Sequence, residues 1–366
     1  MPERARIAYL SQPNLYFFAM KHISLRLSLI AILLVSVIAC NRTPSGNDSV
    51  TYNQSPETGV RTGGVRMIPV KTPSGTFNVW TKRVGNNPRI KVLLLHGGPG
   101  GNHVLFESFE SYFPAEEIEF YYYDQLGSLN SDHPTDSTLW TTPRFVEEVE
   151  QVRQALGLNK DNFYLLGHSW GGILATEYAL KYQQNLKGLI ISNMMSSCTE
   201  YGKYAEEVLG KQMDPKVLTE LKAIEARKDF QNPRYMELLM PNFYAEHVCR
   251  LKPWPNAFDR SFPHMNSTVY TLMQGPSEFG ISGRLATWDR RADLKNINVP
   301  TLTIGGIHDT MDPKHMQWMA TQLPKGTSLI CPDGSHCSMW DDQPHYFPGL
   351  IKFIKGVDAG EEKVVL

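Results

Sequence analysis

The sequence lacks an excess of charge of either sign. Its 366 residues include 36 basic and 37 acidic side chains, which gives a net charge of −1, and no stripe of basic residues stands out. Proteins that bind nucleic acid usually carry a basic surface, so this balance argues against a nucleic-acid partner. Hydrophobic residues make up 42% of the chain and charged residues 20%, proportions typical of a folded globular protein.

The N-terminal apolar segment is too short to cross a membrane. It covers residues 29–39, is interrupted only by Ser36, and follows the basic residues Lys21 and Arg26. A transmembrane helix needs about 20 apolar residues, whereas the core of a secretory signal peptide needs about 7 to 15. We therefore expect residues 1–39 to be a signal peptide.

The end of this segment carries a second signal. Its last residues, Val37-Ile38-Ala39-Cys40, resemble the lipobox of bacterial lipoproteins, in which a small residue precedes the cysteine that receives the lipid. The pattern predicts an exported lipoprotein anchored through Cys40 in the periplasm or at the cell surface. A plain signal peptide with an incidental cysteine is the alternative. Met20 is a second candidate start, which would make residues 1–19 an over-long gene prediction.

Residues 40–60 are rich in Asn, Ser, Thr, Pro and Gly, which predicts a flexible tether between membrane and domain. Cysteine is otherwise scarce: four remain, at positions 198, 249, 331 and 337. An oxidising compartment would allow them to pair. Nearness in the chain predicts the pairs Cys198–Cys249 and Cys331–Cys337, with free buried thiols as the alternative.

Apolar runs typical of strands alternate with segments of helical periodicity. The runs fall at 66–70, 76–83, 90–95, 118–123, 163–166, 189–192, 301–304 and 328–331, and helical spacing is found at 145–156 and 347–354. This alternation predicts an α/β fold with a mainly parallel sheet, helices on both of its faces and an antiparallel hairpin at its start.

The middle of the chain differs from the rest. Residues 198–283 are mainly helical in pattern and dense in proline, methionine and aromatic residues. We expect them to form a helical cap inserted between two parts of the core, residues 61–197 and 284–366. Such a cap would lie over the C-terminal edge of the sheet, where open α/β folds bind ligands.

One motif indicates a catalytic serine. Residues 167–172 read Gly-His-Ser-Trp-Gly-Gly, after an apolar strand and before a helical segment. The pattern G-x-S-x-G between strand and helix is a nucleophile elbow, which exposes its serine on a sharp turn. We therefore expect Ser169 to be the nucleophile; a glycine-rich turn with a bystander serine is the alternative.

A serine nucleophile needs a base and an acid that orients the base. In this architecture the chain order is serine, acid, histidine. Asp309 and His336 follow the strands at 301–304 and 328–331 and are the candidates. Asp312 is the rival acid, although it precedes Pro313 and is better placed to cap a helix at 314–322. His345 is the rival base, farther from its strand.

The oxyanion hole needs two backbone N–H donors. Residues 96–101 read His-Gly-Gly-Pro-Gly-Gly after the strand at 90–95, so the main chain can approach a substrate carbonyl closely. We expect the N–H groups of Gly98 and Trp170 to be the donors. No Gly-Lys-Ser/Thr follows, so a phosphate-binding P-loop is excluded.

Together these motifs resemble those of the proline iminopeptidases, serine aminopeptidases of the α/β-hydrolase fold that include the tricorn-interacting aminopeptidase. The resemblance rests on residues 96–101, 124–128 (Asp-Gln-Leu-Gly-Ser), 167–172 and the cap segment 273–279, and it extends over residues 65–355. It implies release of an N-terminal residue, often proline, from short peptides with a free N-terminus. It also implies that Glu278 binds the substrate's ammonium group and that no metal or organic cofactor is needed.

Two positions depart from the family pattern. Thr310 stands where the family often has a second glutamate after the catalytic aspartate, and Leu126 replaces an arginine. Because the fold does not determine the substrate, an esterase, amidase or lactonase is the first alternative. A non-catalytic lipoprotein that binds peptides is the second.

Overall fold

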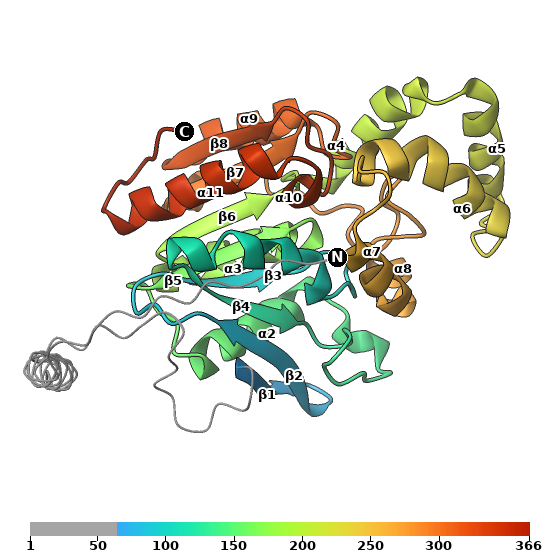
Figure 1. Cartoon of the computed structure of the whole chain (residues 1–366). Helices are drawn as coiled ribbons and strands as arrows, with labels where there is room; N and C mark the ends of the chain where they lie inside the picture. Colours follow the sequence, from blue (N-terminus) through green and yellow to red (C-terminus); the bar gives the residue numbers. More distant parts are fainter. Residues whose placement is uncertain (1–63) are drawn as a thin grey trace, which may run out of the picture. The chain divides into compact units, whose positions relative to one another are not determined.

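An eight-stranded sheet forms the centre of the fold. The structure is a computed structural model, and it describes residues 64–366. The sheet order is β1-β2-β4-β3-β5-β6-β7-β8, and Figure 1 shows its twist. The strands are β1 (Val65–Thr72), β2 (Gly75–Val84), β3 (Lys91–Leu95), β4 (Glu119–Asp124), β5 (Phe163–His168), β6 (Gly188–Ser192), β7 (Thr301–Gly306) and β8 (Gly326–Cys331). Each predicted strand is present.

The strand directions also match the prediction. β1 pairs with β2, and β2 with β4, in antiparallel fashion, whereas the pairs from β4 through β8 are parallel. The N-terminal hairpin is therefore the antiparallel edge of a mainly parallel sheet, as in the predicted α/β fold.

Both faces of the sheet are buried. In β3, Leu93 and Leu95 belong to one hydrophobic cluster and Val92 and Leu94 to the other. One face is covered by α2 (Thr142–Ala155), α3 (Trp170–Tyr182) and α9 (Pro313–Gln322), and the other by η2 (His103–Ser111) and α11 (Gln343–Asp358). Burial on both sides explains why the central strands are continuous apolar runs rather than alternating ones.

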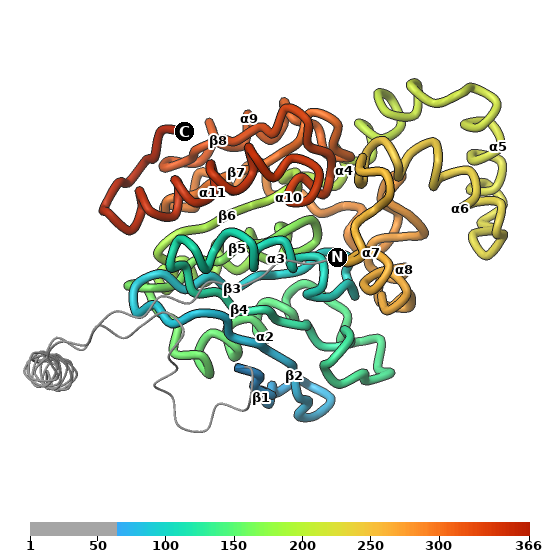
Figure 2. Tube along the Cα trace, in the orientation of Figure 1, coloured from blue at the N-terminus to red at the C-terminus, as the bar shows by residue number. Residues whose placement is uncertain are grey.

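The chain between β6 and β7 forms a group of helices beyond one end of the sheet, and Figure 2 traces its departure from β6 and its return to β7. We call these helices the cap. They include α4 (Cys198–Tyr204), η6 (Ala205–Leu209), α5 (Pro215–Ala226), α6 (Pro233–Leu239), η8 (Met240–Val248), α7 (Asn256–Ser261), η9 (Phe262–His264) and α8 (Ser267–Met273). In Figure 1 they run in colour from yellow-green to orange.

Three helices begin with the same local signal. Asp214, Asn232 and Asp312 each precede a proline, and each side chain accepts a hydrogen bond from the backbone N–H two residues later. The polar side chain satisfies a free N–H of the first turn, and proline suits the first helical position because it needs no N–H partner. The prediction that Asp312 caps a helix is confirmed.

The predicted disulfides are wrong, because the four cysteines described are free and buried. Cys198 and Cys249 belong to different hydrophobic clusters, so nearness in the chain did not bring them together. Burial raises the pKa of the Cys249 thiol to about 12 and that of Cys337 well above its usual value, so both thiols are protonated at neutral pH. The alternative of free buried thiols holds.

The predicted signal peptide, the lipidation site Cys40 and the tether lie outside the described residues. Within residues 64–366, no helix has the length and apolar character needed to span a bilayer.

Candidate active site

Ser169 stands between a strand and a helix, as an elbow requires. It follows the last residue of β5, precedes the first of α3, and has a positive φ of 55°. A Cβ on Gly167 would lie 1.9 Å from the Gly171 carbonyl oxygen, and one on Gly171 would lie 2.0 Å from that of Leu95. Only glycine permits this approach, so the two glycines allow the sharp turn that carries Ser169.

The structure brings His336 and Asp309 together. The Nδ1 atom of His336 lies 2.8 Å from Oδ1 of Asp309, and both side chains are buried. An ionised carboxylate only accepts hydrogen bonds, so Nδ1 carries the proton and Nε2 is left as the acceptor. This is the tautomer that a general base needs.

Asp309 is held from several sides. Its Oδ1 accepts a hydrogen bond from the backbone N–H of Met311 at 3.0 Å, and its Oδ2 accepts one from the side-chain amide of Asn193 at 2.7 Å. Thr310 Oγ1 lies 3.3 Å from Asp309 Oδ1 and 3.1 Å from His336 Nδ1. The residue at the position of the family's second glutamate is therefore a buried neighbour of the acid and the base.

The electrostatics of His336 favour protonation. Burial alone lowers the pKa of its imidazole, but the charge and hydrogen bond of Asp309, together with the charges of Glu278 and Asp341, outweigh it. The pKa is thus raised above the ordinary histidine value of 6.5. A carboxylate partner stabilises the imidazolium that forms when histidine takes a proton.

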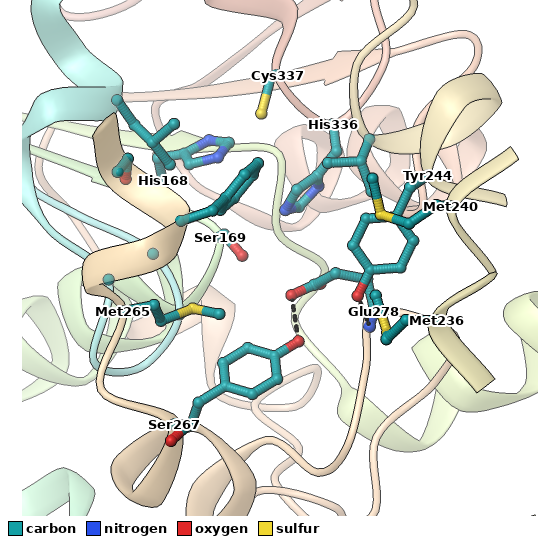
Figure 3. A pocket seen from close by; sticks show the side chains of 18 of the residues that line it. His168, Ser169, Met236, Met240, Tyr244, Met265, Ser267, Glu278, His336 and Cys337 are labelled. Atoms are coloured by element: carbon teal, nitrogen blue, oxygen red, sulfur yellow. Dashed lines mark hydrogen bonds between the residues drawn. The ribbon is translucent and has the colours of Figure 1, made fainter. Parts of the chain in front are cut away.

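A cavity of about 370 Å³ lies beside Ser169 and His336. Ser169, His336 and Glu278 line it and point into the same space in Figure 3. Much of the rest of the wall is apolar and comes from the cap, including Met236, Met240, Trp254, Phe262 and Met265. No lysine or arginine is among the described residues that line the cavity.

Glu278 belongs to the part of the cavity wall that the cap segment forms, and three tyrosines are hydrogen-bonded to it. Its Oε1 accepts a hydrogen bond from Tyr270 at 2.6 Å, drawn dashed in Figure 3. Its backbone N–H donates to Tyr244 Oη at 3.0 Å, and its carbonyl accepts from Tyr201 at 2.5 Å. The position of the carboxylate is therefore set by the cap.

The predicted oxyanion donors both lie near Ser169. Gly98 lines the cavity with a positive φ of 108°, and Trp170 follows the serine at the first position of α3. Gly97 passes so close that a Cβ on it would lie 2.9 Å from the Cβ of Ser169. The glycine loop and the elbow are thus in direct contact.

The rival residues lie elsewhere. Asp312 caps α9, and His345 is exposed and hydrogen-bonded to Asp342 at 2.6 Å. One group of possible metal ligands occurs within residues 64–366, namely Asp333, Asp342 and His345. Asp342 already binds His345 and the backbone N–H of Asp333, and the group does not line the catalytic cavity.

Two buried residues near the site were missed in the sequence. Asn193, with a φ of 52°, binds Asp309, and Gln125 binds both His96 and Trp170. Each comes directly after a strand, β6 or β4, at the edge of the sheet where the site lies. That position was the signal available for Asn193, and Gln125 also lies in the motif at 124–128 that the family resemblance singled out.

Comparisons with known proteins agree with this architecture. A family model described as "alpha/beta hydrolase fold" matches residues 91–343. The proline iminopeptidase of Flavobacterium johnsoniae is 62% identical over 298 residues, which are 81% of this chain and 100% of that protein. The proline iminopeptidase of Elizabethkingia meningoseptica is 63% identical over 295 residues, covering 80% of this chain and 99% of the relative.

Two solved structures have a similar fold. The crystal structure of proline iminopeptidase from Mycobacterium smegmatis has a TM-score of 0.72 and 30% identity, covering 81% of this chain and 99% of that one. VinJ has a TM-score of 0.74 and 28% identity, covering 80% and 99%. The fold and site therefore define a serine hydrolase of the α/β-hydrolase fold. Within that class, the chain belongs to the proline iminopeptidase family.

Proposed function

We propose that this enzyme releases the N-terminal proline from short peptides, with Ser169, His336 and Asp309 as its catalytic triad. The observation that carries the substrate assignment is the placement of Glu278 in the same cavity as Ser169 and His336. In an apolar cavity a carboxylate favours a cationic group, and a free N-terminal amine supplies one.

The proposed reaction begins at Ser169 and His336, which line the same cavity. The hydroxyl of Ser169 attacks the carbonyl carbon of the first residue, and Nε2 of His336 takes the hydroxyl proton. The N–H groups of Gly98 and Trp170 stabilise the tetrahedral oxyanion. His336 then protonates the departing amine, which leaves the N-terminal residue as an ester on Ser169. Water, deprotonated by His336, hydrolyses that ester.

The cap determines which N-terminus is accepted. Glu278 binds the ammonium group, and an acetylated N-terminus would leave this carboxylate in the cavity without a cationic partner. Thr310 stands where the family often has another carboxylate, so ammonium recognition rests on Glu278. The relatives that are 62% and 63% identical are named as proline iminopeptidases, which supports proline as the residue released.

A substrate panel tests the proposal. Purified protein would be assayed with fluorogenic amides of Pro, Ala, Leu and Gly, with N-acetyl-Pro amide and with short acyl esters. We expect cleavage of the proline amide and no cleavage of its acetylated form. Turnover of esters alone would support the esterase alternative. Absence of turnover together with no fluorophosphonate labelling of Ser169 would support a non-catalytic binding protein.

We also propose that the mature enzyme is a lipoprotein anchored through Cys40. The support is the sequence Val37-Ile38-Ala39-Cys40 after an apolar segment of signal-peptide length. The full chain and its Cys40→Ser variant would be expressed in a bacterial host, followed by membrane fractionation and mass spectrometry of the N-terminal peptide. A diacylglyceryl group on Cys40 and its loss in the variant are expected; an unmodified Cys40 would contradict the proposal.

A further inference from the structure

Gln125 connects the two loops that are expected to supply the oxyanion donors. It directly follows β4, and its side chain is buried, with 1% of the residue exposed. Its Oε1 accepts a hydrogen bond from the indole N–H of Trp170 at 2.9 Å, and its Nε2 donates to the carbonyl of His96 at 3.0 Å. Its backbone N–H donates to Nε2 of His96 at 3.1 Å.

We propose that Gln125 is a positioning residue that holds the two halves of the oxyanion hole at a constant separation. The inference rests on the proposed function, because it requires that Gly98 and Trp170 act as the donors. Gln125 does not line the cavity, so it acts through His96 and Trp170.

The order of the strands makes this connection possible. β4, β3 and β5 are neighbours in the sheet, and their C-terminal ends lead to Gln125, to the glycine loop and to Ser169, respectively. The side chain of Gln125 therefore reaches across the end of the middle strand. It contacts the first residue of the glycine loop and the first residue of α3.

The chemistry of the partners allows only one arrangement of the amide. An indole N–H can only donate and a carbonyl can only accept, so Oε1 must face Trp170 and Nε2 must face His96. Glutamate at this position could accept from Trp170 but could not donate to the carbonyl of His96. A primary amide is thus the group that serves both partners.

His96 takes part in its neutral form. Its Nε2 accepts from the Gln125 backbone, while its Nδ1 lies 2.9 Å from the carbonyl of Gly97 and donates to it. Burial lowers the pKa of His96 to about 4, so the imidazole is neutral at pH 7. The ring links Gln125 to Gly97, which contacts Ser169.

The segment that carries Gln125 is itself firmly held. The backbone N–H of Leu126 donates to Glu148 at 2.9 Å, and Glu148 is paired with Arg144. The backbone N–H of Ser128 donates to the carbonyl of Gln125 at 2.9 Å. Because its base is anchored, the side chain of Gln125 can limit the movement of the two loops that it joins.

The expected effect is on the transition state. Oxyanion donors act at 2.7 to 3.1 Å, and loss of one costs about 10²- to 10³-fold in kcat. Loosening both donors without removing either should cost less, about 10- to 100-fold in kcat, with KM changed by less than about 3-fold. If Gln125 served only in folding, its substitution would lower the melting temperature without a selective fall in kcat at nearly unchanged KM.

The test compares Gln125→Met with Gln151→Met in the full-length enzyme. Gln151 is a matched control because its amide also joins two segments, through the backbone N–H and carbonyl of Lys71, away from the site. The measurements are kcat and KM for a proline amide, the rate of fluorophosphonate labelling of Ser169, and the melting temperature. We expect kcat and the labelling rate to fall together in Gln125→Met only.

A second variant, Trp170→Phe, removes the indole donor and keeps the aromatic packing. In that background Gln125→Met should cost less than in the wild type, because one of its contacts is already absent. Rates within 3-fold of wild type in folded Gln125→Met, or a rise in KM alone, would overturn the inference. If Gln125→Met does not fold, wild-type rates in Trp170→Phe would overturn the inference instead.

The labelling rate separates this inference from the proposed substrate. If the wild type cleaves esters but not proline amides, the substrate assignment fails, while the labelling comparison still tests Gln125. If the wild type is not labelled at all, the serine-hydrolase mechanism fails and the inference fails with it.

Discussion

The core side of the catalytic cavity is held by hydrogen bonds between buried polar groups, whereas the cap side consists mainly of apolar side chains. On the core side, Asn193, Asp309 and His336 are joined in one chain of contacts. On the cap side, methionine and aromatic residues surround a single carboxylate, Glu278. In the proposed function, the core supplies reactive geometry, which tolerates little displacement, and the cap supplies selectivity through charge and shape.

The largest effect should come from the core. Ser169→Ala removes the proposed nucleophile, so kcat for a proline amide should fall by about 10³-fold or more. Removal of one hydroxyl should leave the melting temperature and the affinity for free proline close to wild type. Steady-state kinetics and calorimetry check this. Turnover at the wild-type rate would contradict the assignment of the nucleophile.

Acid should lower the stability of the folded protein through His96, which lies on the core side. Its pKa is lowered from 6.5 to about 4 in the folded state by burial, so the unfolded chain binds a proton at higher pH than the folded chain does. Stability should therefore fall as the pH drops from 6.5 towards 4, and this residue alone contributes a loss of about 3 kcal/mol. Denaturant unfolding at several pH values measures the loss. An NMR titration of His96 with a midpoint near 6.5 would contradict it.

The cap should respond to a change of charge. Glu278→Gln keeps the size of the side chain but removes the partner of the substrate ammonium, so kcat/KM for a proline amide should fall by about 10²-fold. An acyl ester without an amine should lose less than about 3-fold. Tyr270→Phe is the control, because it removes one hydrogen bond to Glu278 and retains the charge. Equal losses on amide and ester would refute the cap's role in selectivity.

A smaller core effect is expected at Asn193. Asn193→Gly removes the amide that binds Asp309, while glycine tolerates the positive φ of 52°. With one oxygen of Asp309 unpaired, kcat should fall by about 10-fold and KM should change little. Asn159→Gly, on the surface between α2 and β5, is a control that should keep wild-type kinetics. An unchanged kcat at Asn193 would show that the other bonds to Asp309 suffice.

The smallest expected effect is a change in pH dependence, through which Glu278 on the cap side acts on His336 on the core side. The pKa of His336 is raised, mainly by Asp309 against the opposing effect of burial and further by Glu278. The proposed mechanism needs neutral His336, so kcat/KM should fall as the pH drops through a value above 6.5. In Glu278→Gln this acid limb should move to lower pH, because the charge of Glu278 contributes to the raised pKa of His336. pH profiles of the wild type and of Glu278→Gln, measured with an ester substrate, give the two acid limbs. An unchanged acid limb in the variant would show that the charge of Glu278 does not affect the pKa of His336.

Much of the site could be predicted because its signals are local. Ser169 lies in a six-residue motif, Asp309 and His336 follow apolar runs, and Asp312 precedes a proline. Each of these patterns follows from a constraint within a few residues: a close turn, a strand end or a helix cap. The strands were equally clear, because a sheet covered on both faces needs continuous apolar runs.

Contacts between distant segments could not be predicted. The predicted Cys198–Cys249 disulfide failed because these residues, 51 positions apart in the chain, lie in different hydrophobic clusters. The roles of Gln125 and Asn193 were missed because their partners are 45 and 116 positions away. No local pattern marks Asn193, and the motif at 124–128 does not indicate the partners of Gln125.

The sequence by itself determined the class of fold, the order of the proposed catalytic residues and the chemistry available to them. Only the tertiary structure decided that Glu278 shares a cavity with Ser169, and that Gln125 joins the glycine loop to α3. The physical reason is that local signals depend on backbone conformation within a turn or two, whereas these contacts depend on strand order and on the packing of the cap. Both of these are settled only when the whole chain buries its apolar faces together.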